Sequence, residues 1–243
     1  MHRIYAPHQN FPNKVLITDR NELHHLKNVL RLKKNDTVQL FNGIDQEAMG
    51  VIDDISDINS TVKITEVRSI VPSRPTIILA CAMPKKGKFE TIIEKVTELG
   101  VDEIIPLETQ RSEVKLKGER LVSKMKRFET VAINAAKQCK RTRLPFLHSV
   151  TDFRRTIDQL SVSSRIFLAS LSADRRPLAE ILPGVSKEDR LAVIIGPEGD
   201  FTPEEHTYAL DKGATPVSLG ANVLKVETAA IASVSFIRLY FSS

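Results

Sequence analysis

Five consecutive apolar residues at positions 191–195 end directly at Gly196, and short, mostly apolar runs recur elsewhere after residue 75. An uninterrupted apolar run suits a strand buried on both faces, as parallel strands are, because a strand with one wet face alternates with polar residues. We predict such strands at residues 76–80, 104–105, 165–169, 191–195 and 215–219. Apolar residues at helical spacing predict helices over residues 88–99, 119–138, 203–211 and 228–241. The alternation of strands and helices predicts an α/β domain with a parallel sheet.

The first 70 residues follow a different pattern. Short β-type runs lie at residues 15–18, 37–41, 49–52 and 61–67, separated by turn signals at 42–43 and 57–60. This spacing predicts a small β-barrel. One helix over residues 22–30 interrupts it and leaves His25, Lys27 and Arg31 able to face outwards.

Two prolines three residues apart, Pro72 and Pro75, separate these two regions. Proline interrupts a helix and a central strand alike, so this segment is typical of a linker. We therefore predict two domains, residues 1–71 and 76–243, joined by residues 72–75.

The loop that follows the run at 191–195 is the best candidate for ligand binding. Gly196, Pro197 and Gly199 crowd the end of the predicted strand, where open α/β sheets place ligands. Thr202, Pro203 and Glu205 then begin a helix, with Thr202 as its cap and Glu205 able to complete a capping box. An ordinary turn between core elements remains the alternative for this loop.

Composition narrows the class of protein. The chain has 243 residues, of which 42% are hydrophobic, so it can bury a sizeable core. The apolar runs are too short to span a bilayer, the polar start lacks a secretory signal, and we expect a cytoplasmic protein without membrane contact. Cys81 and Cys139 form no disulfide framework or zinc pair, and we expect both to be reduced.

The positive charge gathers in the middle of the chain. Residues 85–143 carry 15 basic and 9 acidic side chains, whereas the whole chain has a net charge of only +5. A local basic surplus is what a polyanion-binding surface needs, since neutralised phosphates release counterions. A solvated helix surface explains the same charge equally well.

The sequence lacks the motifs of several common classes of enzyme. The sequence has no G-x-x-x-x-G-K-[ST] loop, no G-x-G-x-x-G after a strand and no G-x-S-x-G elbow. His24 and His25 are adjacent and would diverge around a helix, so they make poor joint metal ligands. We expect no metal site.

Taken together, the motif tracts resemble the RsmE family of ribosomal RNA methyltransferases, which belongs to the SPOUT superfamily. The tracts match in order over nearly the whole chain. They are His25 with residues 29–31, residues 41–43, 85–88, 94–101, 111–115 and 138–145, Gly196 to Gly199, and residues 219–229. Any one of these motifs is weak, and the set in register is strong.

The resemblance implies a SPOUT-type α/β trefoil knot with a parallel sheet after a PUA-like RNA-binding β-barrel. It also implies transfer of methyl from S-adenosylmethionine to N3 of a uridine in 16S ribosomal RNA by a homodimer. We expect the assembled small subunit to be the substrate, with naked RNA as the alternative. The nearly uncharged segment 228–241 is compatible with a subunit contact, although an internal core helix explains it equally well.

The resemblance assigns eleven residues to the cofactor. Glycines would let the backbone approach the ligand, and apolar side chains would wall the adenine. The predicted cofactor residues are Leu168, Gly196, Pro197, Glu198, Gly199, Leu219, Gly220, Leu224, Glu227, Thr228 and Ala229. Glu198 either orients the ligand, braces the loop or simply faces water.

Methylation at uridine N3 must remove a proton and stabilise negative charge on the neighbouring oxygens. A fixed cation meets the second need, and Arg111 and Arg141 occupy the matching positions, with Arg111 the better candidate. Contact with a phosphate is the alternative for either. The predicted RNA contacts are Arg3, His25, Arg31, Lys85, Lys86, Lys88 and Lys115, with a solvated surface as the alternative.

Three residues depart from the family pattern. Asp200 replaces a common third glycine, and Asn222 and Lys225 each replace an arginine. These departures motivate an alternative, a non-catalytic RNA-binding or ribosome-assembly factor. A second alternative is a methyltransferase of the same superfamily that acts on another RNA position, such as a ribose hydroxyl.

Overall fold

The computed structural model describes residues 2–85 and 87–242, which fold as two compact units. The first contains residues 2–72 together with residues 136–144, and the second contains residues 73–135 and 145–242. The division between residues 72 and 73 falls within the predicted linker, but the sequence did not indicate that residues 136–144 belong to the first unit. Among the described residues, no helix has the length and apolar character needed to cross a bilayer.

The first unit is built on a five-stranded sheet in the order β1-β3-β4-β5-β2. Among the described strands of this sheet, β1 and β3 pair in parallel, and the other neighbouring strands pair antiparallel. The strands are β1 (His2–Tyr5), β2 (Lys14–Ile17), β3 (Thr37–Phe41), β4 (Gln46–Ile55) and β5 (Ser60–Ser69). Buried Ile4, Leu40, Ile52 and Val62 form its core with Leu26. The β pattern predicted for this region is confirmed.

The predicted helix over residues 22–30 is present as two segments. Asp19 caps α1 (Arg20–His24) by accepting the N–H groups of Asn21 and Glu22, and a π-helical turn (His25–Val29) continues it. Leu23 and Leu26 are buried on its inner side, as amphipathic spacing predicts.

Residues 136–144 pack against the first unit. The Leu144 N–H donates to the Gly43 carbonyl at 2.9 Å. Lys137 Nζ donates to both carboxylate oxygens of Glu22, at 2.7 and 2.8 Å. The predicted long helix, α3 (Gly118–Cys139), therefore ends within the first unit.

The second unit is an α/β structure whose strands all pair in parallel. Its order is β11-β13-β10-β12-β6-β7-β8, with β9 also paired to β7. The strands are β6 (Thr76–Ala82), β7 (Glu103–Glu108), β8 (Phe146–Leu147), β9 (Thr151–Asp152), β10 (Arg165–Ala169), β11 (Arg176–Pro177), β12 (Arg190–Ile195) and β13 (Thr215–Ser218). The helices are α2 (Lys88–Glu98), α3, α4 (Phe153–Ser161), α5 (Leu178–Ile181), α6 (Pro203–Asp211) and α7 (Val226–Ser242).

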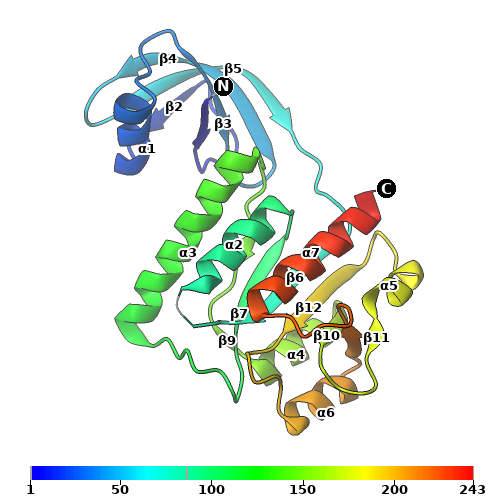
Figure 1. The fold of residues 1–243 in the computed structure, drawn as a ribbon. Helices are drawn as coiled ribbons and strands as arrows, with labels where there is room; N and C mark the ends of the chain where they lie inside the picture. The colour runs from blue at the N-terminus through cyan, green and yellow to red at the C-terminus, as the bar shows by residue number, and fades with distance from the viewer. Residues whose placement is uncertain (1, 86, 243) are drawn as a thin grey trace. The chain divides into compact units, whose positions relative to one another are not determined.

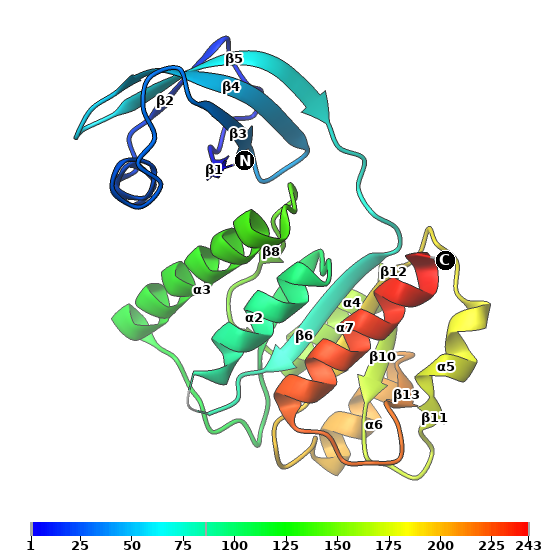
Figure 2. The same cartoon turned by 45° about the horizontal axis from the view of Figure 1, so that its top comes forward.

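Helices cover both faces of this sheet (Figures 1 and 2). Alternate residues of β6 point to opposite sides: Ile77 and Leu79 belong to the core under α2, α3 and α7, whereas Ile78 and Ala80 belong to the core under α4 and α6. Burial on both faces is why these strands are continuous apolar runs. The predicted parallel α/β sheet is confirmed.

Candidate active site

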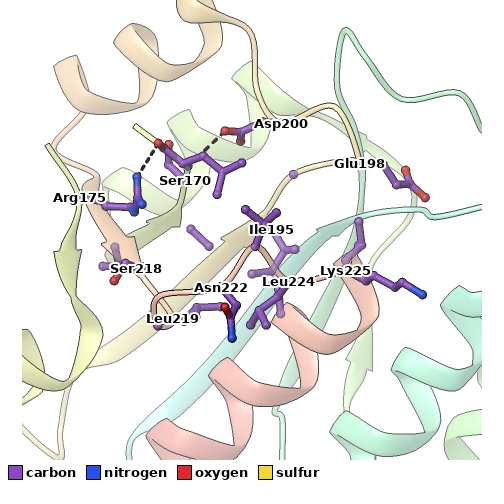
Figure 3. A pocket seen from close by; sticks show the side chains of 18 of the residues that line it. Ser170, Arg175, Ile195, Glu198, Asp200, Ser218, Leu219, Asn222, Leu224 and Lys225 are labelled. Atoms are coloured by element: carbon purple, nitrogen blue, oxygen red, sulfur yellow. Dashed lines mark hydrogen bonds between the residues drawn. The ribbon is translucent and has the colours of Figure 1, made fainter. Parts of the chain in front are cut away.

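Three neighbouring strands, β13, β10 and β12, end at the same edge of the sheet, and the loops that follow them enclose a pocket of about 300 Å³ (Figure 3). Clefts at the carboxyl ends of parallel strands are the usual ligand sites of such sheets. The lining residues are Ala169, Ser170, Leu171, Arg175, Ile195, Gly196, Pro197, Glu198, Asp200, Val217, Ser218, Leu219, Gly220, Ala221, Asn222, Val223, Leu224, Lys225, Val226 and Ala229.

Seven of the eleven predicted cofactor residues line this pocket: Gly196, Pro197, Glu198, Leu219, Gly220, Leu224 and Ala229. Ile195 and Leu224 lie together in the middle of the view in Figure 3, and the side chains of Glu198 and Lys225 point away from them. An apolar centre with polar groups at its margin suits a ligand that combines an aromatic base with charged ends.

The other four predicted cofactor residues, Leu168, Gly199, Glu227 and Thr228, lie outside the lining. Leu168 is fully buried in the core under α4 and α6, on the opposite face of the sheet. The next residue of β10, Ala169, lines the pocket instead, because successive side chains of a strand point to opposite faces. Thr228 is exposed on α7.

Gly196 is required for the shape of the pocket's main loop. A Cβ atom at this position would lie 3.1 Å from the Phe201 ring, tighter than ordinary van der Waals contact. Phe201 is buried and packs against Phe153 with ring centroids 5.2 Å apart, so it has little room to move. A side chain at 196 would therefore displace the loop.

The polar wall of the pocket comes from the loop after β10, which the sequence analysis did not single out. The Asp200 carboxylate accepts the Leu171 N–H at 3.2 Å, and Arg175 donates to the Leu171 carbonyl at 2.5 Å (Figure 3). Arg175 also donates to the Ser172 carbonyl at 2.7 Å. Asp200 has a φ of 59°, a left-handed conformation that Asp tolerates better than most residues. Asp200, Asn222 and Lys225, the three residues expected from the resemblance to differ from the family pattern, all line the pocket.

Arg111 lies beside the loop that contains Gly196. Its Nη1 donates to the Gly199 carbonyl at 2.6 Å and to the Phe201 carbonyl at 3.2 Å. Arg141, the second predicted catalytic residue, belongs to the first unit, where its N–H donates to the Ala136 carbonyl. Arg111 is thus joined to the pocket's own loop.

The thiol of Cys81 is a poor candidate for a nucleophile. Cys81 is fully buried in β6, and burial, followed by the charges of Glu198 and Glu227, raises the pKa of its thiol. A thiol that stays protonated is a poor nucleophile. Among residues 2–85 and 87–242, no group of three or more His, Cys, Asp and Glu side chains is placed to hold a metal ion.

The predicted RNA contacts fall in different environments. Arg31 and Lys115 are exposed, and Lys85 is exposed while pairing with Glu113 at 2.5 Å. His25 is half-buried, and burial followed by the charge of Lys137 lowers its pKa. Lys86 lies outside the described residues.

Arg3 and Lys88 instead have partners within their own units. Arg3 is only 7% exposed, donates to Glu47 and Thr142 and lies over the Phe41 ring, so its guanidinium lies in the interior of the first unit. Lys88 donates to Glu227 at 2.7 Å.

Comparison with known proteins matches both regions to family models. A model described as an RNA methyltransferase domain matches residues 72–238, and one described as an RNA methyltransferase PUA domain matches residues 17–65. Ribosomal RNA small subunit methyltransferase E of Rickettsia conorii is 32% identical over 98% of this chain and 95% of its own length.

Two solved structures share the fold over nearly the full length. A Legionella pneumophila methyltransferase in complex with bound SAM superposes with a TM-score of 0.87 at 30% identity, covering 98% of this chain and 97% of that one. A ribosomal RNA small subunit methyltransferase E from Neisseria gonorrhoeae, bound to S-adenosyl methionine, also gives a TM-score of 0.87, at 24% identity, and covers 99% and 98% of the two chains.

Proposed function

Because the chain belongs to the family of ribosomal RNA small subunit methyltransferases E, it is an RNA methyltransferase, and we propose that it transfers methyl from S-adenosylmethionine to N3 of a uridine in 16S ribosomal RNA. The observation that carries the proposal is the pocket at the ends of β13, β10 and β12, with Arg111 bonded to the same loop. Its volume is at the lower end of the range for small-molecule sites, and its centre is apolar.

Bound S-adenosylmethionine supplies an electrophilic methyl group on a sulfonium, so the protein needs no covalent nucleophile. In the proposed complex the backbone at Gly196 and Pro197 approaches the adenosyl group, and Leu219, Leu224 and Ala229 pack on its base. Gly220 completes the turn with a φ of 132°. Ser170 and Arg175, which also line the pocket, are added as polar contacts.

Arg111 is the proposed catalytic residue. Removal of the N3 proton leaves negative charge on the two flanking oxygens of the uridine, and a fixed guanidinium stabilises it. The carbonyls of Gly199 and Phe201 hold that guanidinium beside the cofactor loop. Arg141 stays a prediction, with contact to uridine oxygens or to a phosphate as its role.

The RNA contacts that we propose are His25 and Arg31 in the first unit and Lys85, Lys88 and Lys115 in the second, without Arg3. The trefoil knot, the assembled small subunit as substrate and cytoplasmic action remain part of the proposal. A homodimer is part of the proposal as well. Phe236, Leu239 and Tyr240, three and four residues apart on α7, are 40%, 66% and 39% exposed and offer apolar surface to a second subunit.

The deciding experiment is transfer of labelled methyl from S-adenosylmethionine to small-subunit particles that lack the modification, followed by nucleoside analysis. We expect labelled N3-methyluridine. A 2′-O-methylated product would indicate a different target in RNA, and no transfer to competent particles would support the ribosome-assembly factor instead. Particles that already carry the modification serve as the control and should accept no label.

A further inference from the structure

Glu205 is a carboxylate buried to 2% exposure in the first turn of α6. Its Oε2 accepts the Thr202 N–H at 3.0 Å, and its own N–H donates to Thr202 Oγ1 at 3.2 Å, which completes the capping box predicted from the sequence. A capping box needs only one of the two carboxylate oxygens. The other oxygen is therefore free for a second partner.

That second partner lies 95 residues earlier in the chain. Glu205 Oε1 accepts the backbone N–H of Gln110 at 2.8 Å. Gln110 is the second residue of a turn in which the Ser112 N–H donates to the Thr109 carbonyl. Ser112 Oγ also accepts the Thr109 N–H at 3.0 Å, and both of these side chains are buried. The turn is thus held internally as well as by Glu205.

Arg111 is the third residue of this turn and connects it to the cofactor loop a second time, through the carbonyls of Gly199 and Phe201. The two connections lie on either side of Thr202: Glu205 follows it and Gly199 and Phe201 precede it. A shift of the loop therefore carries the turn, and with it Arg111, in the same direction.

We propose that Glu205 is a positioning residue that couples the cofactor loop to Arg111, so that the pocket and the guanidinium keep one fixed geometry during methyl transfer. The inference rests on the proposed function of Arg111. Charge-assisted hydrogen bonds from two N–H groups to one buried carboxylate are strong and directional, which suits this task. Orientation matters because a displacement of about 1 Å can cost roughly 100-fold in rate.

The sharpest variant is Gln110→Pro, with Gln110→Ala as its matched control. Proline removes the N–H that Glu205 accepts and places its ring Cδ towards Glu205 Oε1, which lies 2.8 Å from the Gln110 nitrogen, so the carboxylate must also withdraw. Proline is favoured at the second position of common turns, so the turn itself is retained. Alanine removes the same side chain but keeps the N–H. We expect Gln110→Pro to lower kcat about 10- to 100-fold, with KM for S-adenosylmethionine near that of the wild type, and Gln110→Ala to behave like the wild type.

Glu205→Gln tests the same contact from the other side. Gln still completes a capping box, but its amide N–H₂ then faces the Gln110 N–H, donor against donor. We expect a kcat loss like that of Gln110→Pro. Adding Gln110→Pro to Glu205→Gln should cause little further loss, because each single variant already breaks the same contact. Equal kcat for Gln110→Pro and Gln110→Ala, or fully additive losses, would overturn the coupling.

Hydrogen exchange at the Gln110 amide gives a readout that does not depend on activity. We expect this amide to be protected in the wild type and in Gln110→Ala and to exchange much faster in Glu205→Gln. Rapid exchange of the Gln110 backbone N–H in the wild type would contradict its hydrogen bond to Glu205. If the wild type protects this N–H but transfers no methyl group, the hydrogen bond between Gln110 and Glu205 stands. The proposed function, and with it the role of Glu205 in positioning Arg111 for transfer, would then both fail.

Discussion

Lys88 Nζ donates to Glu227 Oε1 at 2.7 Å and so connects the first turn of α2 to the first turn of α7. The two residues were predicted for different ligands, Lys88 for RNA and Glu227 for the cofactor. Because the two side chains form an ion pair, each charge has a partner even when neither RNA nor cofactor is bound. Lys88 is 41% exposed, so one side of its ammonium can still meet a phosphate.

We predict that Lys88→Met raises the pKa of Glu227. The hydrogen bond from Lys88 is the main reason that this pKa lies below its usual value, and partial burial opposes it. Because a lowered pKa favours the folded state only while the carboxylate is charged, the contribution is present above the unfolded pKa and lost as pH falls through the folded pKa. It should be below about 1 kcal/mol for a pair this exposed. Carboxyl NMR titration measures the shift, and Lys95→Met, which removes an ion pair with Glu94 and Glu98, should leave Glu227 unchanged.

Gly196→Ala should weaken both folding and cofactor binding. The added Cβ meets the Phe201 ring at 3.1 Å, and overpacking of this kind costs about 1–3 kcal/mol. Gly184→Ala is the matched control, because its Cβ would meet nothing within 4 Å. Urea unfolding and calorimetric binding of S-adenosylmethionine would compare the two. Equal stability and affinity in both variants would mean that the loop relaxes around the methyl group without effect.

Arg3→Met should destabilise the first unit without changing RNA binding. Arg3 Nη2 lies 2.5 Å from Glu47 Oε1, and its side chain is 4% exposed. Breaking a buried pair leaves an uncompensated charge and costs roughly 3 kcal/mol. Arg68→Met, at an exposed pair with Glu66, should cost at most about 1 kcal/mol. Urea unfolding measures the loss of stability in both variants. A flatter salt dependence of RNA affinity in Arg3→Met would return this residue to the RNA surface.

The sequence predicted the loop and helix around the pocket because their signals are local. Gly196 follows a continuous apolar run, and Thr202 and Glu205 form a capping box that the structure contains. Leu168 shows where such reasoning stops. A strand buried on both faces has no polar positions to mark which face each residue takes, so the sequence could not show that Ala169 rather than Leu168 reaches the pocket.

Other features depend on contacts between distant segments. Residues 136–144 join the first unit through Leu144 against Gly43 and Lys137 against Glu22, and no local periodicity encodes either pair. The polar wall near Arg175 was missed because it carries no glycine motif. Its place after β10, beside the strand that precedes Gly196, is the signal that could have indicated it.

We predict that Arg111→Ala reduces turnover far more than RNA affinity. If the guanidinium stabilises charge that develops only during proton loss, its removal should cost about 100- to 1000-fold in kcat. Arg111→Lys keeps the charge but loses the planar fork, so it should retain part of the activity. Single-turnover transfer with saturating RNA measures the step directly. An unchanged rate in Arg111→Ala would remove this residue from catalysis.

Asp200 must both adopt a left-handed backbone conformation and accept a hydrogen bond from Leu171. Its φ of 59° disfavours most side chains, and its carboxylate accepts the Leu171 N–H of the neighbouring loop after β10. Asp200→Ala retains the strained conformation and loses the acceptor. Asp200→Asn tolerates the conformation and keeps an acceptor oxygen, and Asp200→Gly relieves the strain but loses the contact.

The affinity for S-adenosylmethionine should therefore fall in the order wild type, Asn, Gly, Ala. The left-handed conformation alone costs Ala about 1–2 kcal/mol, which corresponds to roughly tenfold in Kd if the loop leaves that conformation when the ligand is absent. Asn35→Ala, at a φ of 75° in the first unit, imposes similar strain away from the pocket and should lower stability without changing this Kd. If Asp200→Gly bound the cofactor more tightly than the wild type, the hydrogen bond to Leu171 would oppose binding rather than support it.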